Sequence, residues 1–137
     1  MSVLKSRTQT LAAHQALAGY YAGVLRRYTE RTVDLGAAVI ATADGIEIAS
    51  LGGAPGVRPA QLAAMASSLL AVAAAAGREV GHGTCERLFI ETRSGTLLLK
   101  PVGRAGDLVL CMAVSPKTIL AKALWAADEI GKALGQP

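Results

Sequence analysis

Residues 38–50 read AVIATADGIEIAS, and this stretch decides the fold. It contains the end of a continuous apolar run over residues 36–42, then Asp44-Gly45, then the alternating segment Ile-Glu-Ile-Ala-Ser over 46–50. An Asp-Gly pair between two strand-like runs is a strong signal for a two-residue hairpin turn. The stretch therefore predicts two antiparallel strands joined by a tight turn.

Three more strands are expected downstream of this hairpin. Their sequences are rich in apolar and β-branched residues, and short segments containing Gly95 and Gly103 separate them. Connections this short favour antiparallel neighbours. The three expected strands cover residues 84–92, 96–102 and 108–115.

Apolar residues at helical spacing predict three helices. In the first helix, Leu17, Tyr21, Val24 and Tyr28 recur every three or four residues, and Gly77 is expected to end the second. The element order is then α-β-β-α-β-β-β-α in a single α/β (α+β) domain over residues 1–137, with residues 1–9 flexible. The three helices are expected over residues 10–31, 59–77 and 117–134.

The character of each strand indicates its place in the sheet. Strands buried on both faces are continuously apolar, whereas edge strands alternate and carry charge. Residues 37–41 and 108–114 are therefore expected to be central, and residues 46–50 and 85–92 to be edges. With the hairpin connections, this gives the order second, first, fifth, fourth, third, with helices on both faces.

Length and composition restrict the class of protein. A chain of 137 residues with 52% hydrophobic and 18% charged residues is sufficient for one core and is not intrinsically disordered. A net charge of +4 with 4% aromatic residues argues against nucleic-acid binding. Cys85 and Cys111 have neither metal-ligand spacing nor a disulfide pattern, and no signal peptide is evident, so we expect a cytoplasmic protein without a metal or cofactor.

The segment 59–77 is uncharged and nearly as long as a bilayer span. Most of it is alanine, which contributes little to insertion, so we expect no stable membrane insertion. We expect a helix buried on two sides, with its larger residues on the sheet and its small residues on a second copy of the chain. The larger row is Leu62, Met65, Leu69 and Val72, and the small row is Ala64, Ser68, Ala71 and Ala75.

The order of elements resembles the roadblock/LC7 family, which includes the bacterial MglB-type regulators of Ras-like GTPases. The resemblance covers most of the chain and rests on the hairpin 38–50, the small-residue helix 62–77, the motifs LFIET (88–92) and GTLLLKPVG (95–103), and residues 107–110. It implies a five-stranded antiparallel sheet between one helix and a pair of helices. It also implies a homodimer that binds or regulates a small Ras-like GTPase, without catalytic residues of its own.

Signals for catalysis are weak. The phosphate-binding pattern GxxxxGK[ST] does not occur, so the chain is not expected to be a GTPase itself. Four arginines lie in expected loops or at element ends, and the sequence identifies none of them as an arginine finger for a partner GTPase. They are Arg58, Arg78, Arg93 and Arg104.

Two other classes of function stay open. A thiol sensor or thiol enzyme would use Cys85 as the nucleophile, with His82 three residues before it as the base. A small-molecule sensor would hold its ligand in an apolar pocket between sheet and helices. Cys111 lies in an apolar strand and is expected to be a core residue.

Two surface features are candidates for contacts between proteins. Trp125 lies on the polar side of the last helix and is expected to pack against the first helix or, alternatively, to anchor a partner. In the strand 85–92, Arg87 and Glu91 are placed symmetrically about Phe89. If two copies pair antiparallel near Phe89, each Arg87 lies opposite a Glu91 and the sheets join into one of ten strands.

Overall fold

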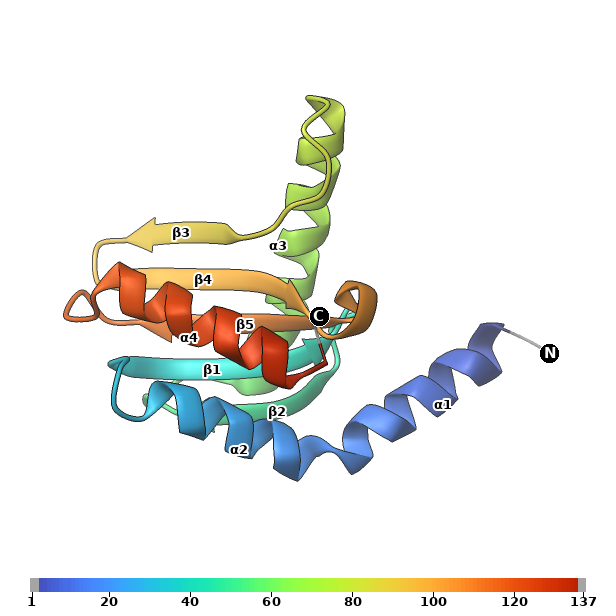
Figure 1. Cartoon of the computed structure of the whole chain (residues 1–137), viewed down its shortest axis with the longest axis horizontal. Coiled ribbons are helices and arrows are strands. Elements are labelled where there is room, and N and C mark those ends of the chain that lie inside the picture. The colour runs from blue at the N-terminus through green and yellow to red at the C-terminus, as the bar shows by residue number, and fades with distance from the viewer. Residues whose placement is uncertain (1–2, 136–137) are drawn as a thin grey trace.

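The computed structural model describes residues 3–135, with side chains from residue 10 onward. Of the segment expected to be flexible, residues 1 and 2 lie outside the described residues, and residues 3–9 belong to the first helix (Figure 1). The elements are α1 (Val3–Ala16), α2 (Ala18–Thr29), β1 (Leu35–Thr42), β2 (Glu47–Gly52), α3 (Pro59–Glu79), β3 (Leu88–Thr92), β4 (Gly95–Val102), a 3-10 turn (Arg104–Gly106), β5 (Leu108–Val114) and α4 (Leu120–Ala133).

The five strands form one antiparallel sheet in the order β2-β1-β5-β4-β3, which confirms the predicted topology. Helices α2 and α4 cover one face of the sheet, and α3 covers the other (Figure 1). The continuously apolar β1 and β5 lie inside the sheet, and the charged β2 and β3 form its edges. The predicted α+β architecture is therefore correct.

Two apolar layers hold the helices to the sheet, because successive strand residues point to opposite faces. In β1, Ala38 and Ile40 join the larger cluster under α2 and α4, whereas Val39 and Ala41 meet Ala63 of α3. Strand β5 alternates in the same way. A strand buried on both faces has no position for a charge, which explains the uncharged runs in the sequence.

The hairpin turn between β1 and β2 has three residues, not the two that Asp44-Gly45 predicts. The Thr42 amide donates to the Ile46 carbonyl at 2.9 Å, so residues 43–45 form the loop. Gly45 takes a φ of +97°, which favours glycine. The Thr42 hydroxyl also donates to Asp44 at 2.5 Å and accepts from the Ile46 amide at 3.0 Å. These side-chain bonds stabilise the longer turn.

The predicted first helix is two helices, because the chain bends at Leu17. This residue has φ −98° and ψ 6°, and its amide donates to the His14 carbonyl at 2.9 Å. Leu17 is exposed, whereas Tyr21 and Val24, from the same predicted row, lie on the side of α2 that is buried in the core. The spacing therefore predicted the packed face of α2 in part, because it did not include the fully buried Leu25.

Three other predicted boundaries are wrong. Helix α3 continues past Gly77 to Glu79, because Gly77 serves close packing: an added Cβ would lie 2.6 Å from the Gly83 carbonyl oxygen. Strand β3 begins only at Leu88, after a loop in which the Cys85 thiol donates to the Arg87 carbonyl at 3.3 Å. Helix α4 begins at Leu120, since hydrogen bonds to Ser115 and Asp34 hold residues 116–119 in a turn.

His14 joins the end of α1 to the domain. Its Nδ1 lies 2.8 Å from the Tyr21 hydroxyl, and its Nε2 lies 3.1 Å from Asp107 Oδ2 in the loop before β5. Burial, reinforced by the charge of Asp107 and by Tyr20, raises the pKa of Tyr21. Ionisation of Tyr21 therefore disfavours the folded state, and stability is lost as the pH rises past the usual value of 10.0.

We expect His14→Ala to destabilise the chain by about 1–2 kcal/mol, because the buried Tyr21 hydroxyl loses its partner. Urea unfolding followed by circular dichroism measures this change. Tyr21→Phe combined with His14→Ala should recover part of the loss, since no hydroxyl is then left unpaired. Equal stabilities of His14→Ala and the wild-type chain would show that the contact contributes nothing.

Candidate functional site

The outward side of α3 carries large apolar residues, contrary to the prediction that they face the sheet. Met65 is 54% exposed, Leu69 is 39% exposed and Val72 is 69% exposed. Only Leu62 of the predicted row packs against the core, and it is half-buried. The prediction is therefore wrong for three of the four residues.

A different row of α3 lies on the sheet. Ala63 and Ala66 are 0% and 1% exposed, and Leu70 is 7% exposed. Small residues at two of these positions let the helix approach the strands closely, and Leu70 fills the space near Leu99 and Cys111. Because α3 is apolar on all sides, helical periodicity alone could not identify the row that faces the sheet.

The small residues of α3 are exposed beside the large ones. Ser68, the polar member of this row, donates its hydroxyl to the Ala64 carbonyl of its own helix at 3.1 Å. No charged residue occurs between Arg58 and Arg78. We define the α3 outer face as Ala64, Met65, Ser68, Leu69, Ala71, Val72 and Ala75.

Helix α3 is also long and apolar enough to cross a membrane by length and composition alone. An 18-residue stretch of this helix has a mean hydropathy of 1.6, and only 17% of that stretch is buried within the chain. In Figure 1 the C-terminal part of α3 extends past the edge strand β3. Much of this helix therefore has no covering within the described residues.

The β3 edge lies next to this overhanging helix. Leu88 and Ile90 pack toward α3, so the alternate residues Phe89 and Glu91 point to the other face of the sheet. Phe89 is 40% exposed. Arg87 lies one residue before the observed strand, although the sequence predicted it to lie within the strand.

Arg87 also has a partner within its own chain. Its guanidinium lies 3.6 Å from Asp128 of α4, and the ammonium of Lys100 donates to the same carboxylate. The Lys100 hydrogen bond, followed by the charges of Lys100 and Arg87, holds the pKa of Asp128 below its usual value of 3.8. This cluster could not be predicted from the sequence, because its members come from three distant segments: the loop before β3, strand β4 and helix α4.

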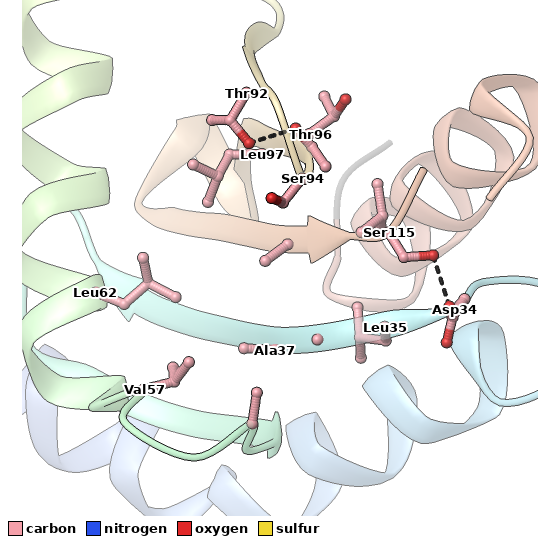
Figure 2. Close-up of a pocket in the computed structure, with 15 residues that line it drawn as sticks. Asp34, Leu35, Ala37, Val57, Leu62, Thr92, Ser94, Thr96, Leu97 and Ser115 are labelled. Carbon is pink, nitrogen blue, oxygen red and sulfur yellow. Dashed lines mark hydrogen bonds between the residues drawn. The ribbon is translucent and has the colours of Figure 1, made fainter. Parts of the chain in front are cut away.

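An apolar cavity of about 520 Å³ opens on the α3 side of the sheet (Figure 2). Leu62 and Val57 line it near the start of α3, and Leu97 and Ala37 line it from the strands. The polar side chains at its rim largely bond to near neighbours: Thr92 donates to the Gly95 carbonyl, and Ser115 donates to Asp34. The cavity is therefore a part of the sheet face that α3 leaves uncovered.

The thiol candidates are not brought together by the structure. Cys85 is half-buried near α3 and donates to the Arg87 carbonyl, whereas the side chain of His82 is exposed and has no hydrogen bond within residues 10–135. Burial raises the pKa of the Cys111 thiol to about 12, as expected for a core residue.

We expect iodoacetamide at neutral pH to label Cys85 no faster than a free cysteine. Unusually fast labelling of Cys85 would support thiol chemistry.

The remaining candidates lie apart from one another. The side chains of Arg58, Arg78, Arg93 and Arg104 are all exposed. Trp125 packs edge-on against Tyr28 of α2, with ring centroids 6.0 Å apart, as the sequence predicts for contact with the first helix. It is nevertheless 48% exposed, so a contact with a partner stays a prediction.

The fold described above, a five-stranded antiparallel sheet with α3 on one face and α2 and α4 on the other, is shared with a known family of domains. The model of the Roadblock/LC7 domain matches residues 21–113, so the chain belongs to the roadblock/LC7 family. The match runs from α2 to β5 and includes all five strands and α3. No curated protein matches the chain.

Solved structures of the same fold agree with this assignment. MglB in a tetrameric arrangement superposes with a TM-score of 0.77 at 18% identity, covering 88% of this chain and 89% of that one. A roadblock/LC7 domain from Streptomyces avermitilis gives 0.74 at 20% identity, covering 82% and 92%. Myxococcus xanthus MglB gives 0.71 at 20% identity, covering 82% and 93%.

Proposed function

We propose that this chain is a cytoplasmic, non-catalytic homodimer that binds a small Ras-like GTPase and modulates its nucleotide cycle or location. The observation that carries the proposal is the α3 outer face, which is exposed and uncharged over residues 64–75 of this helix. A surface of this kind usually belongs to an interface between proteins. Membership of the roadblock/LC7 family and the likeness to MglB structures support a regulatory role.

The register of the sheet favours a particular dimer. Phe89 lies opposite Leu98 of β4, and α3 covers Leu99, one residue further along. A two-fold axis that is perpendicular to the sheet and runs beside Phe89, between the two β3 strands, would place the partner's α3 at an equal distance on the other side. The two helices would then cross the sheet about 7 Å apart along the strand direction, a close approach of the kind that small side chains allow.

This arrangement would cover the surfaces that the single chain leaves open. The overhanging part of each α3 would lie over the partner's sheet, at the level of Leu97, where the apolar cavity opens. The β3 edges would join, and Arg87 would face Glu91 of the partner subunit. The resulting two-fold platform, with its ten-stranded sheet, is the surface on which we expect the GTPase to dock.

Reversing the charge in Arg87→Glu should weaken the dimer about tenfold, because two cross-strand pairs become repulsive. Adding Glu91→Arg in the same chain should restore the wild-type affinity. Arg93→Glu, an exposed charge reversal just beyond β3, is the matched control and should have little effect. Sedimentation equilibrium measures all four chains. If the double variant associates no better than Arg87→Glu, the proposed register is wrong.

The alternative covering for α3 is a lipid bilayer. Flotation with neutral phosphatidylcholine vesicles distinguishes a bilayer from a second copy of the chain as the covering of α3. A dimer that buries the α3 outer face should stay at the bottom of the gradient. A chain that floats, and is monomeric in detergent, would overturn the dimer.

The regulatory half of the proposal is tested by mixing the chain with Ras-like GTPases encoded next to it. We expect a complex that depends on the bound nucleotide, and a change in the rate of nucleotide hydrolysis or release. The GTPase alone is the baseline. A dimer that binds none of these GTPases in either nucleotide state would contradict this half and leave the dimer intact.

A further inference from the structure

A row of exposed aromatic side chains follows the seam between α2 and α4, on the sheet face opposite α3. Tyr20 is 55% exposed and its hydroxyl donates to the Ala133 carbonyl at 3.0 Å. At the other end of the seam, half-buried Tyr28 contacts Trp125 edge-on, at an interplanar angle of 71°. The two helices are thus antiparallel, and their contact line has an aromatic group at each end.

A cleft of about 290 Å³ lies between these aromatic ends. Gly23 forms part of its lining, and no other group lies within 4 Å of the position of an added Cβ there. Tyr20 and Tyr28 are eight residues apart on the helix, which is about 12 Å. Four residues of a polyproline II helix span about the same length, at about 3.1 Å each.

Among the described side chains, the polar groups along the seam that have no hydrogen-bond partner are mainly donors. Within residues 10–135, no hydrogen bond or ion pair engages the Trp125 indole N–H, the Tyr28 hydroxyl or the Arg27 guanidinium. The Arg27 guanidinium lies over the Tyr28 ring, 5.5 Å from its centroid. A proline-rich segment offers backbone carbonyls without N–H groups, so its polar groups complement such a site.

Positive charge predominates at the Trp125 end of the seam. Arg27, Arg31 and Lys122 lie there without an ion pair among the described side chains. Glu30 and Asp34 are acidic residues in the same region, where Asp34 accepts a hydrogen bond from Ser115 and Lys117 adds a further positive charge, while Glu129 is 3.8 Å from Lys132 and is thereby compensated. Acidic residues next to the prolines of a ligand would be attracted to this end.

We infer that the α2–α4 seam binds a proline-rich, acidic-flanked segment of a partner protein in the polyproline II conformation. Aromatic grooves recognise such segments by packing prolines between rings while donors reach the carbonyls. The seam lies on the opposite sheet face from α3, so the proposed dimer leaves it accessible. The inference does not depend on GTPase binding.

Calorimetric titration of the full chain with a peptide of eight prolines followed by two glutamates tests this inference. We expect saturable binding to each subunit, together with a change in the fluorescence of Trp125, the single tryptophan. A peptide with glycine and serine in place of the prolines, but the same glutamates, should bind at least about tenfold more weakly.

Two variants assign the binding to the seam. Tyr20→Ser and Trp125→Ala should each weaken binding about tenfold or more, as expected for aromatic anchors. Ile46→Ala, which truncates an exposed apolar side chain beside the hairpin turn, should leave it unchanged. Absence of saturable heat at millimolar peptide, equal binding of the glycine-serine peptide, or full affinity in both aromatic variants would each overturn the inference.

Discussion

Ser68→Arg is expected to convert the dimer into a monomer at micromolar concentration. Ser68 lies in the middle of the α3 outer face, where its hydroxyl bonds only to its own helix. An arginine there would bring two unpaired charges into the contact between the helices. Burying an unpaired charge costs several kcal/mol, so the dissociation constant should rise at least about 30-fold. Sedimentation velocity at several concentrations measures the change.

Ala121→Arg is the matched control, because it adds the same charge at an exposed position on α4. It should leave the dimer unchanged, and circular dichroism should show both variants folded. A Ser68→Arg chain that stays dimeric would place the interface elsewhere on the molecule.

Asp128→Ala is expected to lower the free energy of unfolding by about 1–3 kcal/mol. It removes the carboxylate that both Lys100 and Arg87 contact. The Lys100 side chain is only 12% exposed, so its ammonium would be left without compensation, although the 40% exposure of Asp128 lets water screen part of the effect. Urea unfolding at neutral pH measures the loss.

The second substitution Lys100→Met provides the control, since it removes the stranded charge and should recover much of the stability. The effect should also depend on pH. Because the pKa of Asp128 is lowered, its carboxylate stabilises the fold above its usual value of 3.8, and this contribution is lost as the pH falls through the lowered value. A loss in Asp128→Ala that is the same at all pH values would exclude the ion pair as its cause.

The sheet could be predicted from the sequence because the amino-acid composition of each strand indicates whether the strand is central or at an edge. The uncharged runs of β1 and β5 require burial on both faces, whereas Glu47 and Glu91 fit only at edges. The short hairpin connections are then compatible with one order of strands in the sheet, in which each strand has the central or edge position that its composition indicates. These are local signals, and the structure confirms their result.

The site could be predicted only in part, because its details depend on contacts between distant segments. A helix that is apolar on all sides does not reveal which row meets the sheet, so the exposure of Met65, Leu69 and Val72 was missed. Close to the bend at Leu17 and the late start of β3, His14 and Arg87 contact Asp107 and Asp128, which are distant in the sequence. Nor does the sequence indicate the cavity beside α3, which exists because that helix covers only part of the sheet.

Sedimentation velocity of the chain mixed with a Ras-like GTPase encoded beside it tests both the proposed dimer and its binding to the GTPase. We expect a dimer of the 14.0 kDa chain alone, and a heavier complex when the GTPase is in one of its two nucleotide states. The Ser68→Arg chain should form neither species. A monomer that sediments separately from the GTPase in both nucleotide states would overturn the proposed dimer and its proposed binding to the GTPase.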